Sequence, residues 1–198
     1  MATGFSNLAE LQQAIGGVPL DRIRMVPPPG SAALADAISA DKMSEPICEL
    51  VDGVLIEKAV GYRESLLAAT LIQLLGDFVR KHDLGLLAGA DAISEYYAGC
   101  VRAPDVSFVS WGRLPGRQVP DNPIPDLVPD LAVEIVSSSN TAAEMDRKLA
   151  DFKQGGVRVV WLIDPRKEIA RCTSETRRRW RSTRPATSTP AMCCPTLS

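Results

Sequence analysis

The sequence predicts an α/β domain with a mixed central β-sheet flanked by helices. Two β-rich runs surround Asp52-Gly53 within residues 47–58, which is a strong hairpin signal. Residues 62–82 carry apolar side chains at three- and four-residue spacing, which predicts a long amphipathic helix. A strand–helix–strand pattern follows at residues 131–164. Together these observations indicate an α/β fold whose sheet is mixed.

The remaining elements follow from composition. Residues 1–45 are expected to form a short helix and a loose lead-in. Residues 26–31, "VPPPGS", are expected to be a loop, because three prolines fit neither a helix interior nor a central strand. Residues 86–98 and 101–110 are expected to be strands. The five prolines of residues 111–130 predict a long loop.

The strand–helix–strand pattern has clear boundaries. Residues 131–136 and 157–164 are apolar enough to be buried strands. The helix between them, residues 142–154, begins at a capping box formed by Thr141 and Glu144. Two glycines end it.

Composition excludes several classes of protein. With 198 residues, 45% of them hydrophobic and 23% charged, the chain matches one globular domain. No apolar run reaches the ~20 residues of a membrane span. The N-terminus has no secretory signal pattern, so a cytoplasmic protein is expected. The five cysteines form no CxxC motif, and the single histidine, His82, excludes chemistry that needs two.

An acidic residue stands inside each of two apolar β-rich runs. Glu134 interrupts residues 131–136, and Asp105 follows Pro104. An unpaired carboxylate costs roughly several kcal/mol to bury, so each should be neutralised, paired or bound to a metal. A hard divalent ion such as Mg²⁺ between the two would satisfy both. Two other readings stay open: Asp105 caps a turn, and Glu134 pairs with Arg102.

These residues resemble the PD-(D/E)XK nuclease superfamily, which has the restriction-endonuclease-like fold, and in particular its Uma-type family of restriction endonucleases. The resemblance covers about residues 45–170. It rests on four segments: "ELVDG" (49–53), "VRAPDVSFV" (101–109), "PDLAVEIVSSSNTAAEMDRKLADF" (129–152) and "GVRVVWLIDP" (156–165).

The resemblance implies a catalytic site with metal. Asp105 and Glu134 would hold Mg²⁺ (or Mn²⁺), and Lys148 would orient or deprotonate the attacking water or stabilise charge on phosphorus. The superfamily pattern has its lysine two residues after the glutamate, where this chain has Val136. Lys148, on the next helix, matches the place from which the Uma-type branch takes its lysine. An ordinary solvated lysine is the alternative reading of Lys148.

Two further residues match family positions. Glu49 matches an acidic position and would contact the metal through water. Arg102 fits a phosphate or a carboxylate partner. The implied function is an Mg²⁺-dependent endonuclease that hydrolyses DNA phosphodiester bonds. The alternative is a catalytically silent binding module that keeps the fold, which Val136 favours. Many nucleases of this fold work as homodimers, and that state stays open here.

The charge and composition change near the C-terminus. Residues 1–170 contain 16 Lys and Arg against 23 Asp and Glu, whereas residues 171–198 contain six Arg and one Glu. The negative net charge of residues 1–170 does not indicate non-specific nucleic-acid binding. The last 28 residues have one Leu and no Ile or Val, which predicts a disordered tail after an endonuclease-like domain at 46–170.

The family resemblance offers a reason for the unusual tail. The family continues with a strand ending in Val-Tyr and with a stretch like Gly-Asp-Val-Leu-Pro. Codons for residues 190–195, "PAMCCP", can encode Gly-Asp-Val-Leu-Pro in another frame. We therefore predict a shifted reading frame from near residue 170 that has replaced a sheet strand. The alternative is a basic DNA-binding tail, supported by "RRRWR" (177–181). The gene's nucleotides decide between them.

Overall fold

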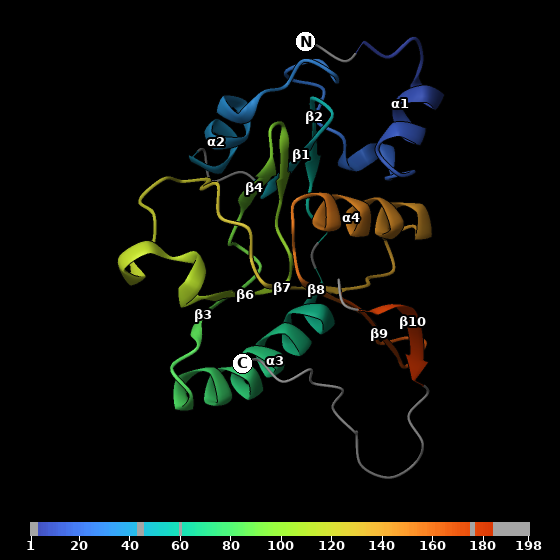
Figure 1. Ribbon diagram of the computed structural model, residues 1–198. Helices are drawn as coiled ribbons and strands as arrows, with labels where there is room; N and C mark the ends of the chain where they lie inside the picture. The colour runs from blue at the N-terminus through green and yellow to red at the C-terminus, as the bar shows by residue number, and fades with distance from the viewer. Residues whose placement is uncertain (1–3, 43–45, 60, 175–176, 184–198) are drawn as a thin grey trace.

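Two β-sheets and four α-helices make up the part of the chain that the computed structural model describes, which is residues 4–42, 46–59, 61–174 and 177–183 (Figure 1). The helices are α1 (Leu8–Ala14), α2 (Leu34–Lys42), α3 (Tyr62–Lys81) and α4 (Ala142–Gln154). The smaller sheet has the order β2-β1-β5-β4 and the larger one the order β10-β9-β8-β7-β6-β3.

The strands of the smaller sheet are β1 (Cys48–Val51), β2 (Val54–Glu57), β4 (Ser94–Tyr97) and β5 (Cys100–Arg102). Strands β1 and β2 form the predicted hairpin. Its turn places Asp52 at φ 49° and Gly53 at φ 76°. Positive φ at both central residues matches the right-handed twist of hairpin strands, which explains the Asp-Gly pair.

The strands of the larger sheet are β3 (Gly85–Ala88), β6 (Val106–Ser110), β7 (Leu131–Ile135), β8 (Val159–Asp164), β9 (Ile169–Ser174) and β10 (Arg177–Thr183). Strands β7 and β8 are parallel and joined by α4, whereas β3, β6, β9 and β10 pair antiparallel with their neighbours. The mixed sheet predicted from the sequence is therefore confirmed.

The large sheet lies between α3 on one face and α4 on the other (Figure 1). Val133 and Ile135 of β7 pack in the same cluster as Ala68 of α3. Ala132, which precedes Val133 and so faces the opposite side of the sheet, packs with Phe152 of α4. Because side chains alternate between the two faces of a strand, Glu134 lies on the α4 face with Ala132.

The helix termini follow the sequence signals. The Thr141 side chain caps α4 by accepting a hydrogen bond from the Glu144 N–H at 3.0 Å. The Glu144 side chain, however, pairs with Arg22 at 3.0 Å.

Within the described residues, no helix combines the length and the apolarity that crossing a bilayer requires.

Two predicted strands are each divided between the sheets. The expected strand at 86–98 is β3 of the large sheet and β4 of the small one, and the expected strand at 101–110 is β5 and β6. The second break coincides with Pro104, which cannot donate to a strand ladder. The chain thus passes from one sheet to the other immediately before Asp105.

The N-terminal segment is packed more firmly than the expected loose lead-in. Leu11, Ile15, Val18 and Ile23 form one buried cluster with Val51, Val54 and Ile56 of the hairpin. This segment therefore covers one side of the small sheet.

The C-terminal segment differs from the expected tail. Strands β9 and β10 extend the large sheet where a disordered tail was expected, so β8 keeps an outer neighbour. Residues 175–176 and 184–198 lie outside the described residues. The shifted reading frame stays a prediction.

Candidate functional site

Glu134 lies in β7, and Asp105 immediately precedes β6, the neighbouring strand. The β6–β7 register ends at the pair Val106 and Val133, and Asp105 and Glu134 are the next residues beyond it. The Asp105 N–H donates to the Val133 carbonyl at 2.9 Å, and Asp105 Oδ2 accepts from the Ile135 N–H at 2.7 Å. These two hydrogen bonds hold Asp105 beside the residues that flank Glu134.

Lys148 of α4 contacts Glu134 directly. Its Nζ lies 3.1 Å from both carboxylate oxygens of Glu134. The side chains are 5% and 6% exposed, so the reading of Lys148 as a solvated lysine is wrong. The reading of Glu134 as the partner of Arg102 is also not what the structure shows.

Glu49 of β1 lies on the other side of the Lys148 ammonium, with Oε1 3.0 Å from Nζ. Its Oε2 accepts from Arg102 Nη1 at 2.7 Å, and its Oε1 also accepts from the Ala103 N–H at 3.2 Å. Both oxygens are therefore held by protein groups. Glu49 fixes the positions of Lys148 and Arg102, which differs from the water-mediated metal contact that the resemblance implied.

Arg102 has two carboxylate partners. Besides Glu49 it binds Asp151 of α4, with Nε 3.0 Å from Asp151 Oδ2. The other oxygen of Asp151 accepts from the Tyr97 hydroxyl at 2.6 Å and from Arg147 Nε at 3.0 Å. This network joins the small sheet to α4 and holds the helix that carries Lys148.

Two residues of these buried ion pairs, Asp151 and Lys58, were not among the site residues predicted from the sequence. Asp151 lies one helical turn after Lys148 on the buried side of α4. Its position three residues after Lys148, on the same side of the helix, was the sequence signal that could have identified it. Lys58, directly after β2, lies 3.0 Å from Asp105 Oδ1. No local pattern marks it, because its partners are far away in sequence.

Burial and neighbouring charges give the two glutamates opposite pKa shifts. For Glu134, burial raises the pKa, the charges of Asp105 and Glu49 add to this, and Lys148 only partly opposes it, so the pKa is about 7. For Glu49, burial also favours the neutral form, but the charges of Lys148, Arg102 and Lys58 outweigh it and lower the pKa to about 2. The pKa of Lys148 is raised, since Glu134 and Glu49 outweigh the effect of burial.

We expect the metal-free protein to lose stability as the pH rises from 4.5 to 7. The pKa of Glu134 rises from 4.5 to about 7 on folding, so the native state holds this proton more tightly than the unfolded chain does. The stabilisation is complete below pH 4.5 and lost through pH 7, and it amounts to about 3 kcal/mol. The pKa of Glu49 is lowered on folding, so its contribution to stability is present above pH 4.5 and is lost as the pH falls below that value.

Urea unfolding in EDTA at pH 5 and pH 8 measures this effect. The isosteric variant Glu134→Gln should lose this part of the pH dependence. An unchanged pH dependence in the variant would contradict the assignment of the proton to Glu134.

The buried charged residues around Lys148 include oxygen ligands suited to a hard cation. Asp105 and Glu134 provide carboxylate oxygens, and the pKa of Glu134 is raised first by burial and then by the charges of Asp105 and Glu49, which a cation would offset. Across the part of the chain that the structure describes, no three Asp, Glu, His or Cys side chains are gathered to hold a metal ion. Mg²⁺ is commonly bound by only one or two carboxylates together with water and substrate phosphate. Val136, at the superfamily's lysine position, is buried.

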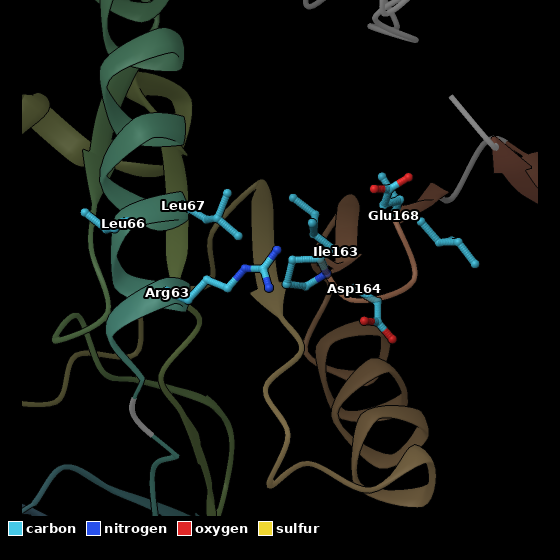
Figure 2. Close-up of a pocket in the computed structure, with 9 residues that line it drawn as sticks. Arg63, Leu66, Leu67, Ile163, Asp164 and Glu168 are labelled. Carbon is cyan, nitrogen blue, oxygen red and sulfur yellow. The ribbon is translucent and has the colours of Figure 1, made fainter. Parts of the chain in front are cut away.

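A surface pocket lies elsewhere, between α3 and the β8–β9 turn (Figure 2). Arg63, Leu67, Ile163 and Glu168 are among its lining residues. Asp105, Glu134 and Lys148 do not line it. The pocket is therefore separate from the charged cluster on the α4 face.

Comparison with known proteins places this geometry in a family. Curated proteins give no match to the chain. A similar solved structure is a "putative nuclease belonging to DUF820" from Anabaena variabilis, with a TM-score of 0.62 and 17% sequence identity. The alignment covers 71% of this chain and 78% of that chain. At this identity the match shows the fold, which is the restriction-endonuclease-like α/β fold.

The sequence itself matches a family model. The model is described as "Uma2: Putative restriction endonuclease" and matches residues 37–197, which include Asp105, Glu134 and Lys148. Because the match spans well over half of the chain, this protein belongs to the Uma2 family, whose description is "Putative restriction endonuclease".

Proposed function

We propose that this protein is a divalent-metal-dependent endonuclease that hydrolyses DNA phosphodiester bonds at Asp105 and Glu134. The observation that carries the proposal is that Asp105 is hydrogen-bonded to Val133 and Ile135, the residues on either side of Glu134, with the Lys148 ammonium 3.1 Å from both Glu134 oxygens. The family description and the description of the similar structure as a nuclease support DNA as substrate.

Asp105 and Glu134 are the residues that would hold Mg²⁺ or Mn²⁺. Their oxygens are the ligands that these ions prefer. A bound divalent ion supplies Lewis-acid activation of a phosphate oxygen and lowers the pKa of a bound water. The side chain of Asp105 is 15% exposed, more than that of Glu134, so Asp105 is the more accessible of the two.

Lys148 would act as a charged donor. Its raised pKa keeps it protonated at neutral pH, so it is better suited to stabilise negative charge on a phosphate than to remove a proton from water. Glu134 and Glu49 hold the ammonium from two sides and thereby fix its position. Of the roles that the resemblance implied for Lys148, charge stabilisation and orientation fit best.

The second candidate function is a catalytically silent binding module. It is favoured by Val136 at the superfamily's lysine position and by the closed ion pairs of Lys148. In this case the cluster would be structural. Metal binding and DNA cleavage distinguish the two functions.

The test is cleavage of supercoiled plasmid DNA. We expect nicking with Mg²⁺ or Mn²⁺, no nicking in EDTA, and none with Glu134→Gln or Asp105→Asn. Asp121→Asn, in an exposed loop, is the matched control and should retain activity. Circular dichroism should show that the variants remain folded.

Cleavage that persists in both site variants would show that the chemistry occurs elsewhere. A folded wild-type protein that binds Mn²⁺ and DNA without cutting would instead support the silent module.

A further inference from the structure

A second buried lysine lies against the proposed metal ligands. Lys58 follows β2 and has a side chain that is only 5% exposed. Its Nζ lies 3.0 Å from Asp105 Oδ1 and donates to the Ala103 carbonyl at 2.6 Å and to the Ala90 carbonyl at 3.3 Å. The Lys58 N–H bonds to the Ile47 carbonyl at 2.8 Å, which fixes the backbone at the base of the hairpin.

Each carboxylate oxygen of Asp105 has a protein partner in this arrangement. Its Oδ2 accepts from the Ile135 N–H at 2.7 Å, and its Oδ1 faces the Lys58 ammonium. A cation that approaches Oδ1 therefore meets another positive charge already there. Two like charges at such a distance repel strongly in a poorly solvated site.

Lys58 is held differently from Lys148. Lys148 lies between two carboxylates, those of Glu134 and Glu49, so withdrawing it would separate two ion pairs. Lys58 has one carboxylate and two neutral carbonyls as partners, so withdrawing it from Asp105 would separate only one ion pair. Displacing Lys58 from Asp105 by a cation therefore breaks fewer ion pairs than displacing Lys148 would.

We propose that Lys58 is the resident counter-ion of Asp105, with which a divalent cation competes for this carboxylate, so that Lys58 sets the metal affinity of the site. This inference rests on the proposed metal site at Asp105 and Glu134. In the metal-free protein Lys58 compensates the charge of Asp105. When metal binds, Ala103 and Ala90 retain the ammonium nearby.

The alternative is that Lys58 only clamps two loops to the hairpin. The two roles predict effects of opposite sign. Removing a clamp loosens the ligands and weakens metal binding, whereas removing a competing charge strengthens it. Metal affinity is therefore a readout that a purely structural role would not increase.

The experiment is calorimetric titration of Mn²⁺ into the metal-free full chain. We expect Lys58→Met to bind Mn²⁺ about tenfold more tightly than the wild type or better, because one unit of opposing charge is removed at close range. Lys58→Gln, which is neutral but keeps donors for the two carbonyls, should show the same gain and carries the test if Lys58→Met does not fold. Lys153→Met removes an exposed lysine of α4 and should leave affinity unchanged.

A second measurement is thermal unfolding without and with Mn²⁺. Lys58→Met should unfold at a lower temperature without metal and should gain more from Mn²⁺ than the wild type does. Adding Asp105→Asn should abolish the gain, since the effect is exerted at that carboxylate.

The outcomes separate this inference from the proposed function. Equal or weaker Mn²⁺ binding in both Lys58 variants, with normal binding in the wild type, overturns the counter-ion role alone. No binding in any of the proteins overturns the metal site and the counter-ion role together.

Discussion

Replacing Arg102 by methionine is expected to lower the free energy of unfolding by about 3–5 kcal/mol, the range for breaking a buried ion pair by removing one partner. The Arg102 side chain is 2% exposed and neutralises both Glu49 and Asp151, which are 1% and 3% exposed. Without the guanidinium these two carboxylates remain buried with less compensation. Methionine keeps much of the apolar volume, so the loss reports mainly on charge.

Urea unfolding at pH 7 measures this change. Arg80→Met is the matched control: Arg80 pairs with Asp77 at 2.7 Å, but both side chains are more than 70% exposed. A surface pair of this kind contributes at most about 1 kcal/mol. Similar losses for Arg102→Met and Arg80→Met would show that the Glu49–Arg102–Asp151 network does not stabilise the fold as the structure indicates.

Replacing Lys148 by methionine is expected to lower the rate of DNA cleavage about 10²–10³-fold, the range for losing one group that stabilises developing charge. The Nζ of Lys148 is fixed by Glu134 and Glu49, so its charge is already positioned before substrate binds. The measurement is the single-turnover cleavage rate at saturating metal and DNA. Thermal unfolding of the variant shows whether a lower cleavage rate reflects the loss of a catalytic group or the loss of the fold.

The control for this prediction is Lys153→Met, on an exposed position of the same helix. Arg147, although adjacent to Lys148, is a poor control because it pairs with Asp52 and Asp151 and donates to the Ala14 carbonyl. A folded Lys148→Met protein that cuts DNA as fast as Lys153→Met would exclude Lys148 from the chemistry.

Local signals in the sequence located most elements of the fold. The Asp52-Gly53 turn, the apolar spacing of α3 and the Thr141 cap of α4 each depend on residues only a few positions apart. Such patterns are readable because the backbone conformation is chosen locally. The division of β5 from β6 was missed although Pro104 marks it, because both segments are β-rich and the sequence does not show that their partners lie in different sheets.

The C-terminal strands were missed for a related reason. An Arg- and Thr-rich composition argues against a buried core, yet β9 needs only a free edge of β8 to pair with. Backbone hydrogen bonds to an existing strand do not depend on apolar side chains. Composition was therefore a poor guide to pairing at this edge of the sheet.

By itself, the sequence determined that Asp105 and Glu134 are acids within apolar β-rich runs, and the cost of burying them required partners. The tertiary structure alone decided which partners they have. Lys58 meets Asp105 across 47 positions of the chain and Arg102 meets Glu49 across 53, and no local periodicity encodes such distances. These contacts arise only when two sheets and α4 pack together, because packing brings their charged side chains into one poorly solvated volume.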